Sequence, residues 1–85
     1  MLDIPAPTVF DVITDFLASE PSPEAIIAYH LPDDLQARVD ALVERNGEGQ
    51  LTFDEQQELL DYMRADEMMA LLKAKTKLRL RNANK

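Results

Sequence analysis

Apolar residues recur at helical spacing from residue 9 onward. The first group consists of Val9, Phe10, Ile13, Phe16 and Leu17. Residues three and four positions apart lie on one face of an α-helix, so this group predicts an amphipathic helix. Thr8 stands at the N-cap position, and Asp11 follows three residues later as a short capping box. We therefore predict a first helix near residues 8–18, which the segment 19–21 ends with a proline.

Prolines mark the starts of two further helices. Ser22 is a favourable N-cap residue and Pro23 suits the first helical position, so a short second helix is predicted there. It stops before Pro32, because a proline disfavours helical backbone in the residue that precedes it. Pro32 also begins a third helix, whose apolar stripe is Leu35, Val39, Leu42 and Val43. Asn46 and Gly47 are typical of a helix end, so this helix is predicted to stop near them.

A long final helix is predicted to begin at Phe53. Thr52 and Glu55 form a full capping box, and neither proline nor glycine occurs from residue 53 to residue 85. Apolar residues continue at helical spacing through Leu60, Met63, Leu71, Ala74 and Leu78. A helix from 53 to about 80 is roughly 40 Å long at 1.5 Å per residue, which is longer than the preceding helices can cover. The predicted fold class is all-α, with three short helices followed by one long C-terminal helix.

The segment 73–81 has a second interpretation. Its basic residues alternate with apolar or small ones, which also fits a strand that pairs with another chain. Lysine, arginine, alanine and leucine all favour helix, so we expect helix here.

Charge divides the chain into two parts. The net charge is −7, and residues 1–67 hold all 16 acidic residues and three of the nine basic ones. Residues 68–85 hold the other six basic residues and no acidic residue. We therefore expect an acidic helical domain over residues 1–72 and a basic C-terminal extension of the last helix over 73–85. The acidic domain disfavours nucleic-acid binding, so contact with nucleic acid would be weak and would depend on the basic tail.

Composition restricts the compartment and the kinds of site. There is no cysteine, so neither a disulfide framework nor a thiolate metal site is expected. The longest apolar run has five residues, far short of the roughly 20 that a membrane span needs. The first five residues lack the basic region and the apolar stretch of a signal peptide. We expect a cytoplasmic protein that does not interact with a membrane.

One segment resembles the calcium loop of an EF-hand. In the twelve residues from Glu44 to Glu55, Asn46 and Glu48 fall at the third and fifth positions and Gly49 falls at the sixth. Glutamate replaces the usual aspartate at the first position, and the long side chain of Glu48 suits a compact calcium cage poorly. A glycine-containing turn followed by a capping box explains the same residues. We therefore expect no metal ion to bind here.

No arrangement of residues indicates catalysis. His30 is the single histidine and precedes Leu31-Pro32, a pattern typical of a turn. The acidic residues of the third predicted helix are typical of a solvated face. The sequence lacks a phosphate-binding glycine loop and any nucleophile paired with a base. We predict that the protein is not an enzyme and that it uses no cofactor.

The run Met68-Met69-Ala70-Leu71-Leu72 is the strongest indication of a binding surface. Five consecutive apolar residues cover every direction around a helix, whereas burial of one face needs a stripe only about 100° wide. Basic residues follow directly, and they would form a charged rim that attracts an acidic partner. The predicted partner-binding residues are Met68, Met69, Leu71, Leu72, Lys73, Lys75, Lys77 and Arg79. The partner would be another protein chain, either a different protein or a further copy in an oligomer.

Three segments carry a resemblance to a known group of proteins. They are residues 16–24, residues 47–52 together with Glu55, and residues 71–75. The chain resembles small helical bacterial proteins, common in cyanobacteria, whose genes often lie beside toxin genes or genes for HNH-type nucleases. Phe53 stands where a proline is commoner in that group. The resemblance implies an antitoxin-like or accessory role.

These observations favour a protein–protein interaction module with an antitoxin- or immunity-like role toward a nuclease. The alternative is an accessory protein that contacts nucleic acid through its basic tail.

Overall fold

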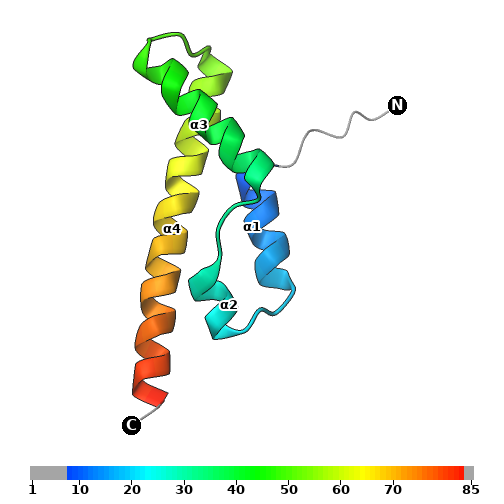
Figure 1. Ribbon diagram of the computed structural model, residues 1–85, viewed down its shortest axis with the longest axis vertical. Coiled ribbons are helices and arrows are strands. Elements are labelled where there is room, and N and C mark those ends of the chain that lie inside the picture. The colour runs from blue at the N-terminus through cyan, green and yellow to red at the C-terminus, as the bar shows by residue number, and fades with distance from the viewer. Residues whose placement is uncertain (1–7, 84–85) are drawn as a thin grey trace, which may run out of the picture.

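The computed structural model describes residues 8–83 as four α-helices and no strand (Figure 1). They are α1 (Val9–Ala18), α2 (Pro23–Ala28), α3 (Asp33–Gly47) and α4 (Phe53–Ala83). The predicted all-α class is therefore confirmed. The segment 73–81 belongs to α4, so it is helical in this structure and does not form the strand that its alternating pattern also allowed.

Local capping interactions set the helix starts that the sequence predicted. At α1, the Thr8 N–H donates to Asp11 Oδ2 over 2.9 Å, and the Asp11 N–H donates to Thr8 Oγ1 over 3.2 Å. At α2, Ser22 Oγ accepts from the Ala25 N–H. At α4, Thr52 and Glu55 form the same reciprocal pair as the one at α1. Each cap satisfies backbone donors that have no partner within the helix.

The length of α3 corrects the expectation of three short helices. This helix has 15 residues, more than the average of about 11–12 in globular proteins. It ends at Gly47 with Glu48 as its C-cap, and Gly49 follows with a φ of +71°, in the left-handed region that glycine adopts readily. The Gly49 N–H donates to the Asn46 carbonyl, and the Gln50 N–H donates to the Arg45 carbonyl. These two bonds form a Schellman motif, which satisfies the last carbonyls of α3.

Helix α4 is the element on which the other three pack. Its 31 residues extend about 46 Å at 1.5 Å per residue, close to the 51 Å longest extent of the molecule. Helix α3 crosses the first part of α4, and α1 and α2 lie along one side of it (Figure 1). The shortest extent is only 18 Å, so the fold is a thin layer that covers α4 on one side.

The core lies between α4 and the helices that cover it. Its buried residues are Val9, Ile13, Leu31, Val39, Ala65 and Met69, and the half-buried Leu17, Tyr29, Leu35, Tyr62 and Leu72 pack around them. The Phe16 and Tyr29 rings stack with their centroids 4.2 Å apart. Leu42 on α3 and Leu59 on α4 are also buried, near the turn that joins these two helices.

Candidate interaction surface

Helix α4 carries two apolar faces on opposite sides. At about 100° per residue, Ala65 and Met69 lie within one narrow sector of the helix together with Tyr62 and Leu72. A second apolar set lies on the opposite side. Its members are Phe53, Leu60, Met63, Leu71, Ala74 and Leu78, and we call this set the open face. A helix that buries one side of a small domain needs only one apolar stripe, so the second stripe requires an explanation.

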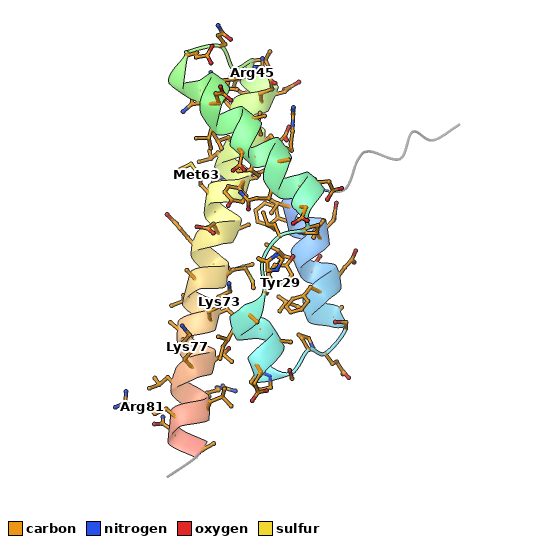
Figure 2. The ribbon with its side chains drawn as sticks, in the orientation of Figure 1. Tyr29, Arg45, Met63, Lys73, Lys77 and Arg81 are labelled. Carbon is orange, nitrogen blue, oxygen red and sulfur yellow. The ribbon has the colours of Figure 1, made fainter. Side chains whose placement is uncertain are left out.

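Helices α1, α2 and α3 pack on the first face of α4 and leave the open face exposed to solvent. Met69 is 5% exposed, whereas Leu71 is 57% exposed and Leu78 is 55% exposed. Phe53, at the start of the helix, is 73% exposed. In Figure 2, Met63 lies on the side of α4 away from α1 and α2. The open face is therefore an apolar strip that extends along most of the longest helix.

The structure divides the predicted apolar contact residues between the two faces. Met68 and Leu71 are exposed, as an interface requires. Met69, however, belongs to the core cluster, and Leu72 packs against it. The physical reason is the helical repeat, because residues 69 and 72 follow Tyr62 and Ala65 at intervals of seven and lie above them on the covered side. These two residues serve the chain's own core.

The predicted basic residues do not form one stripe. The Lys73 ammonium lies on the covered side and donates a hydrogen bond to the Tyr29 carbonyl, so it links α4 to the segment after α2 (Figure 2). Lys75, Lys77 and Arg79 are exposed. At about 100° per residue, Lys75 and Arg79 lie on one side of the helix, whereas Lys77 lies on the opposite side. A charged rim on one side of an interface would include at most part of this set.

The apolar spacing along the chain predicts the helix that carries the open-face residues but not the surface that they form. Leu60, Met63 and Leu78 indicated a helix, but their spacing does not say which side of it is covered. A signal was nevertheless present: Phe53, Leu60 and Ala74 share a repeat of seven, and so do Leu71 and Leu78. A seven-residue repeat of apolar positions is the pattern of a helix that pairs with another helix.

Charge changes sign along α4. Residues 53–67 hold six acidic residues and one basic residue, whereas residues 68–83 hold five basic residues and no acidic one. This order stabilises the helix itself, since negative charge near the N-terminus and positive charge near the C-terminus oppose the helix dipole. It also gives the two halves of α4 opposite charge, and the charge changes sign near the middle of the open face.

The segment that resembles a calcium loop has a different geometry. Glu44 and Asn46 lie within α3, so the first and third positions of the pattern are helical. Glu55, at the twelfth position, pairs with Arg45 and accepts the Thr52 N–H over 3.0 Å. These hydrogen bonds, first with Thr52 and then with Arg45, lower the pKa of Glu55. Over residues 8–83, no group of three or more possible metal ligands is found.

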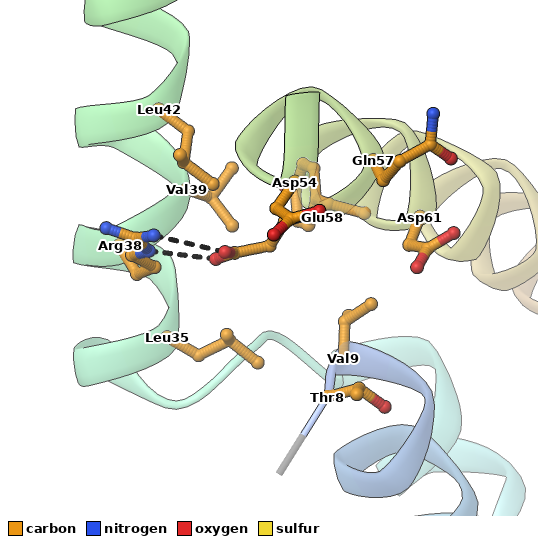
Figure 3. Close-up of a pocket in the computed structure, with 11 residues that line it drawn as sticks. Thr8, Val9, Leu35, Arg38, Val39, Leu42, Asp54, Gln57, Glu58 and Asp61 are labelled. Atoms are coloured by element: carbon orange, nitrogen blue, oxygen red, sulfur yellow. Dashed lines mark hydrogen bonds and ion pairs between the residues drawn. The ribbon is translucent and has the colours of Figure 1, made fainter. Parts of the chain in front are cut away.

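A groove lies where the start of α1 meets α3 and α4 (Figure 3). Its volume is about 550 Å³, and its apolar walls include Val9, Leu35 and Val39. Arg38 on α3 bonds both carboxylate oxygens of Glu58 on α4, over 2.8 and 3.1 Å. The remaining charged residues of the lining, Asp54 and Asp61, are both acidic. The lining includes neither histidine nor serine.

His30 remains a turn residue in the structure. It is exposed between α2 and α3, and its Nδ1 lies 3.2 Å from the Leu31 carbonyl oxygen.

No family model, curated protein or solved structure matches this chain. Among residues 8–83, no helix is both long enough and apolar enough to cross a membrane.

Proposed function

We propose that this protein is a protein–protein interaction module and that the open face of α4 is its contact surface. The observation that carries the proposal is that six exposed apolar side chains lie on one side of the longest helix, among a few polar ones. Scattered exposed apolar residues are ordinary on protein surfaces, but several of them gathered on one side of a helix usually mark an interaction site. Burial of this strip in a complex would release about 25 cal/mol for each Å² of apolar surface removed from water.

For the partner we propose a nuclease, toward which this chain has an antitoxin- or immunity-like role. The support is the resemblance to proteins encoded beside nuclease genes, together with the charge of the chain. A nuclease binds a polyanion, so its substrate-binding surface is basic. A chain with a net charge of −7 would be attracted to such a surface and would accelerate the encounter.

The test is to measure binding of this chain to the nuclease encoded beside its gene, and inhibition of that nuclease. The variant carries Leu71→Asp and Leu78→Asp, which place two carboxylates on the open face without touching the core. We expect its helix content to be unchanged and its affinity for the nuclease to fall by roughly 100-fold or more, because interfaces tolerate buried unpaired charge poorly.

Val43→Asp on α3 is the matched control. Val43 is 54% exposed, as open to solvent as Leu78, but it lies on a different helix. The control variant should bind and inhibit the nuclease as the wild type does. Equal losses in both variants, or undiminished binding by the open-face variant, would refute the assignment of the surface.

A second proposal is that the chain is an accessory protein that contacts nucleic acid. The observation in its favour is that Lys75, Lys77, Arg79 and Arg81 are exposed on the last turns of α4, where residues 8–83 show no carboxylate paired with them. Its test is how the binding of duplex DNA depends on salt concentration.

A further inference from the structure

We infer that the open face of α4 pairs with the same face of a second copy of this chain, with the two helices antiparallel. This inference rests on the part of the proposed function that makes the open face a contact surface, and it names a second copy, in place of the nuclease, as the chain that covers this face. The charge distribution and the seven-residue repeat of α4 both favour a second copy of the chain as the partner.

Five of the six open-face residues, all but Met63, fall on the seam positions of a coiled coil, and Gln57, Arg64 and Glu67 occupy the other seam positions. One series of positions seven residues apart is Phe53, Leu60, Glu67 and Ala74, and the second is Gln57, Arg64, Leu71 and Leu78. The two series alternate at intervals of three and four, which is the spacing of the two seam positions of a heptad. Tyr62, Met69 and Thr76 lie directly opposite the seam and are covered by the rest of the chain. A second helix can therefore approach the seam without displacing α1, α2 or α3.

The charge of α4 decides the orientation. In a parallel pair, the acidic residues 53–67 of one copy would lie beside the acidic residues 53–67 of the other, and the basic halves would also meet. In an antiparallel pair, each acidic half meets the basic residues 68–83 of its partner. Like charges in contact oppose association and opposite charges favour it, so antiparallel pairing is selected. A two-fold axis generates this arrangement from two identical chains.

The residues of the seam also decide the register. We place the two-fold axis level with the midpoint between residues 65 and 66. The facing seam residues of the two helices then form four kinds of layer, and each kind occurs twice. The layers are Phe53 with Leu78, Gln57 with Ala74, Leu60 with Leu71, and Arg64 with Glu67. Asp54 of each copy then lies beside Lys75 of the other at the edge of the seam. A shift of one heptad toward the C-terminus would place Arg64 against Ala74 and Glu67 against Leu71, leaving both charges without partners.

The layers of Arg64 with Glu67, on either side of the two-fold axis, can be tested by exchanging their charges. Self-association of the wild type is measured by analytical ultracentrifugation, together with the variants Arg64→Glu and Glu67→Arg. Each variant replaces two attractive pairs in the dimer with two repulsive ones, so its self-association constant should fall by roughly tenfold or more. An equimolar mixture of the two variants restores both pairs, so it should form heterodimers with the affinity of the wild type. Both positions are exposed, and circular dichroism should show the same helix content throughout.

Cysteine crosslinking tests the register independently of charge. The chain contains no cysteine, so Leu60→Cys and Leu71→Cys each introduce a single thiol. In the proposed register, residue 60 of one copy faces residue 71 of the other, whereas two copies of residue 60 lie roughly 16 Å apart along the seam. A disulfide requires Cα atoms within about 7 Å. On oxidation, the mixture of the two variants should therefore form a crosslinked dimer, and either variant alone should stay uncrosslinked.

Self-pairing and the proposed function can fail separately. A wild-type chain that stays monomeric at high concentration would overturn self-pairing, and so would a disulfide in Leu60→Cys alone or the failure of the charge-exchange mixture to associate. None of these results concerns the nuclease, which is measured in its own assay with the Leu71→Asp and Leu78→Asp variant. Loss of nuclease inhibition with a monomeric wild type would identify the nuclease as the partner of the open face. Self-association that survives charges on the open face would overturn self-pairing through this surface.

Discussion

Glu55 shows how one side chain fixes the junction between α3 and α4. One carboxylate oxygen accepts the Thr52 N–H and caps α4, and the other pairs with Arg45 near the end of α3. Arg45 also donates to the Gln50 carbonyl, so the turn between the helices is held from both sides. The capping interaction was evident from the sequence because it is local. The pairing with Arg45 was not, because it depends on how the turn folds back.

The pKa of Glu55 leads to a prediction about acid stability. Its pKa in the folded chain lies below the ordinary value of 4.5, chiefly through the Thr52 backbone hydrogen bond and then through Arg45. A lowered folded pKa stabilises the fold at pH values above the ordinary one, and this contribution disappears as pH falls through the folded pKa. We expect Glu55→Gln to lower the urea midpoint at about pH 7 and to reduce the further loss on acidification to about pH 3.

Glu44→Gln is the control for this experiment. Glu44 is exposed on α3, and its side chain forms no ion pair within residues 8–83. Its variant should keep the acid response of the wild type. An acid response in Glu55→Gln equal to that of the wild type would contradict the role assigned to this carboxylate.

At the scale of the element, α4 explains why the helices were predictable and the surface was not. Three helix starts are marked by side-chain caps at Thr8, Ser22 and Thr52, and Pro32 marks the start of α3, so the starts were evident in the sequence. The choice between the two apolar faces of α4 is made by the placement of the other helices. Leu71 and Met69 have similar hydrophobicity and stand two residues apart, and only the fold shows that one is open and the other buried.

Truncating each face of α4 in turn should have different effects on stability. Met69→Ala removes a buried side chain from the core and should lower the free energy of unfolding by about 2–3 kcal/mol. Leu71→Ala removes a side chain from the open face and, in the monomer, should change the free energy of unfolding by less than about 0.5 kcal/mol. Chemical denaturation at low protein concentration measures both. Similar losses in the two variants would show that residue 71 is also buried within a single chain.

At the scale of the whole molecule, charge determines which partners the chain can approach. The acidic helices pack around a core of modest size, and five basic residues, all in the segment 73–81, lie toward one end of the 51 Å long axis. Sequence composition already showed this division into acidic and basic parts. The structure adds that the basic part is helical and that Lys73 and Leu72 attach its beginning to the fold, so the expected boundary at residue 72 falls within one continuous helix.

The same distribution predicts weak and salt-sensitive binding of nucleic acid. Lys75 and Arg79 lie on one side of α4 and Lys77 lies on the opposite side, so only some of them can contact one duplex at a time, and the acidic helices repel it. We expect binding of duplex DNA to be measurable at low salt and to vanish at about 0.15 M salt. Fluorescence anisotropy over a salt series measures this. Sequence-specific binding that persists at that salt would contradict the prediction and would favour the accessory role in nucleic-acid contact.

The position of α4 in the chain has a consequence for synthesis on the ribosome. Helices α1, α2 and α3 all emerge before the helix on which they pack. At about 5–20 residues per second, translation of the 31 residues of α4 takes roughly 2 to 6 s, whereas a helix forms within about a microsecond. During those seconds Ile13 and Val39 have no Met69 to pack against. The nascent chain therefore presents its apolar residues to chaperones, and its core closes only after α4 has left the exit tunnel.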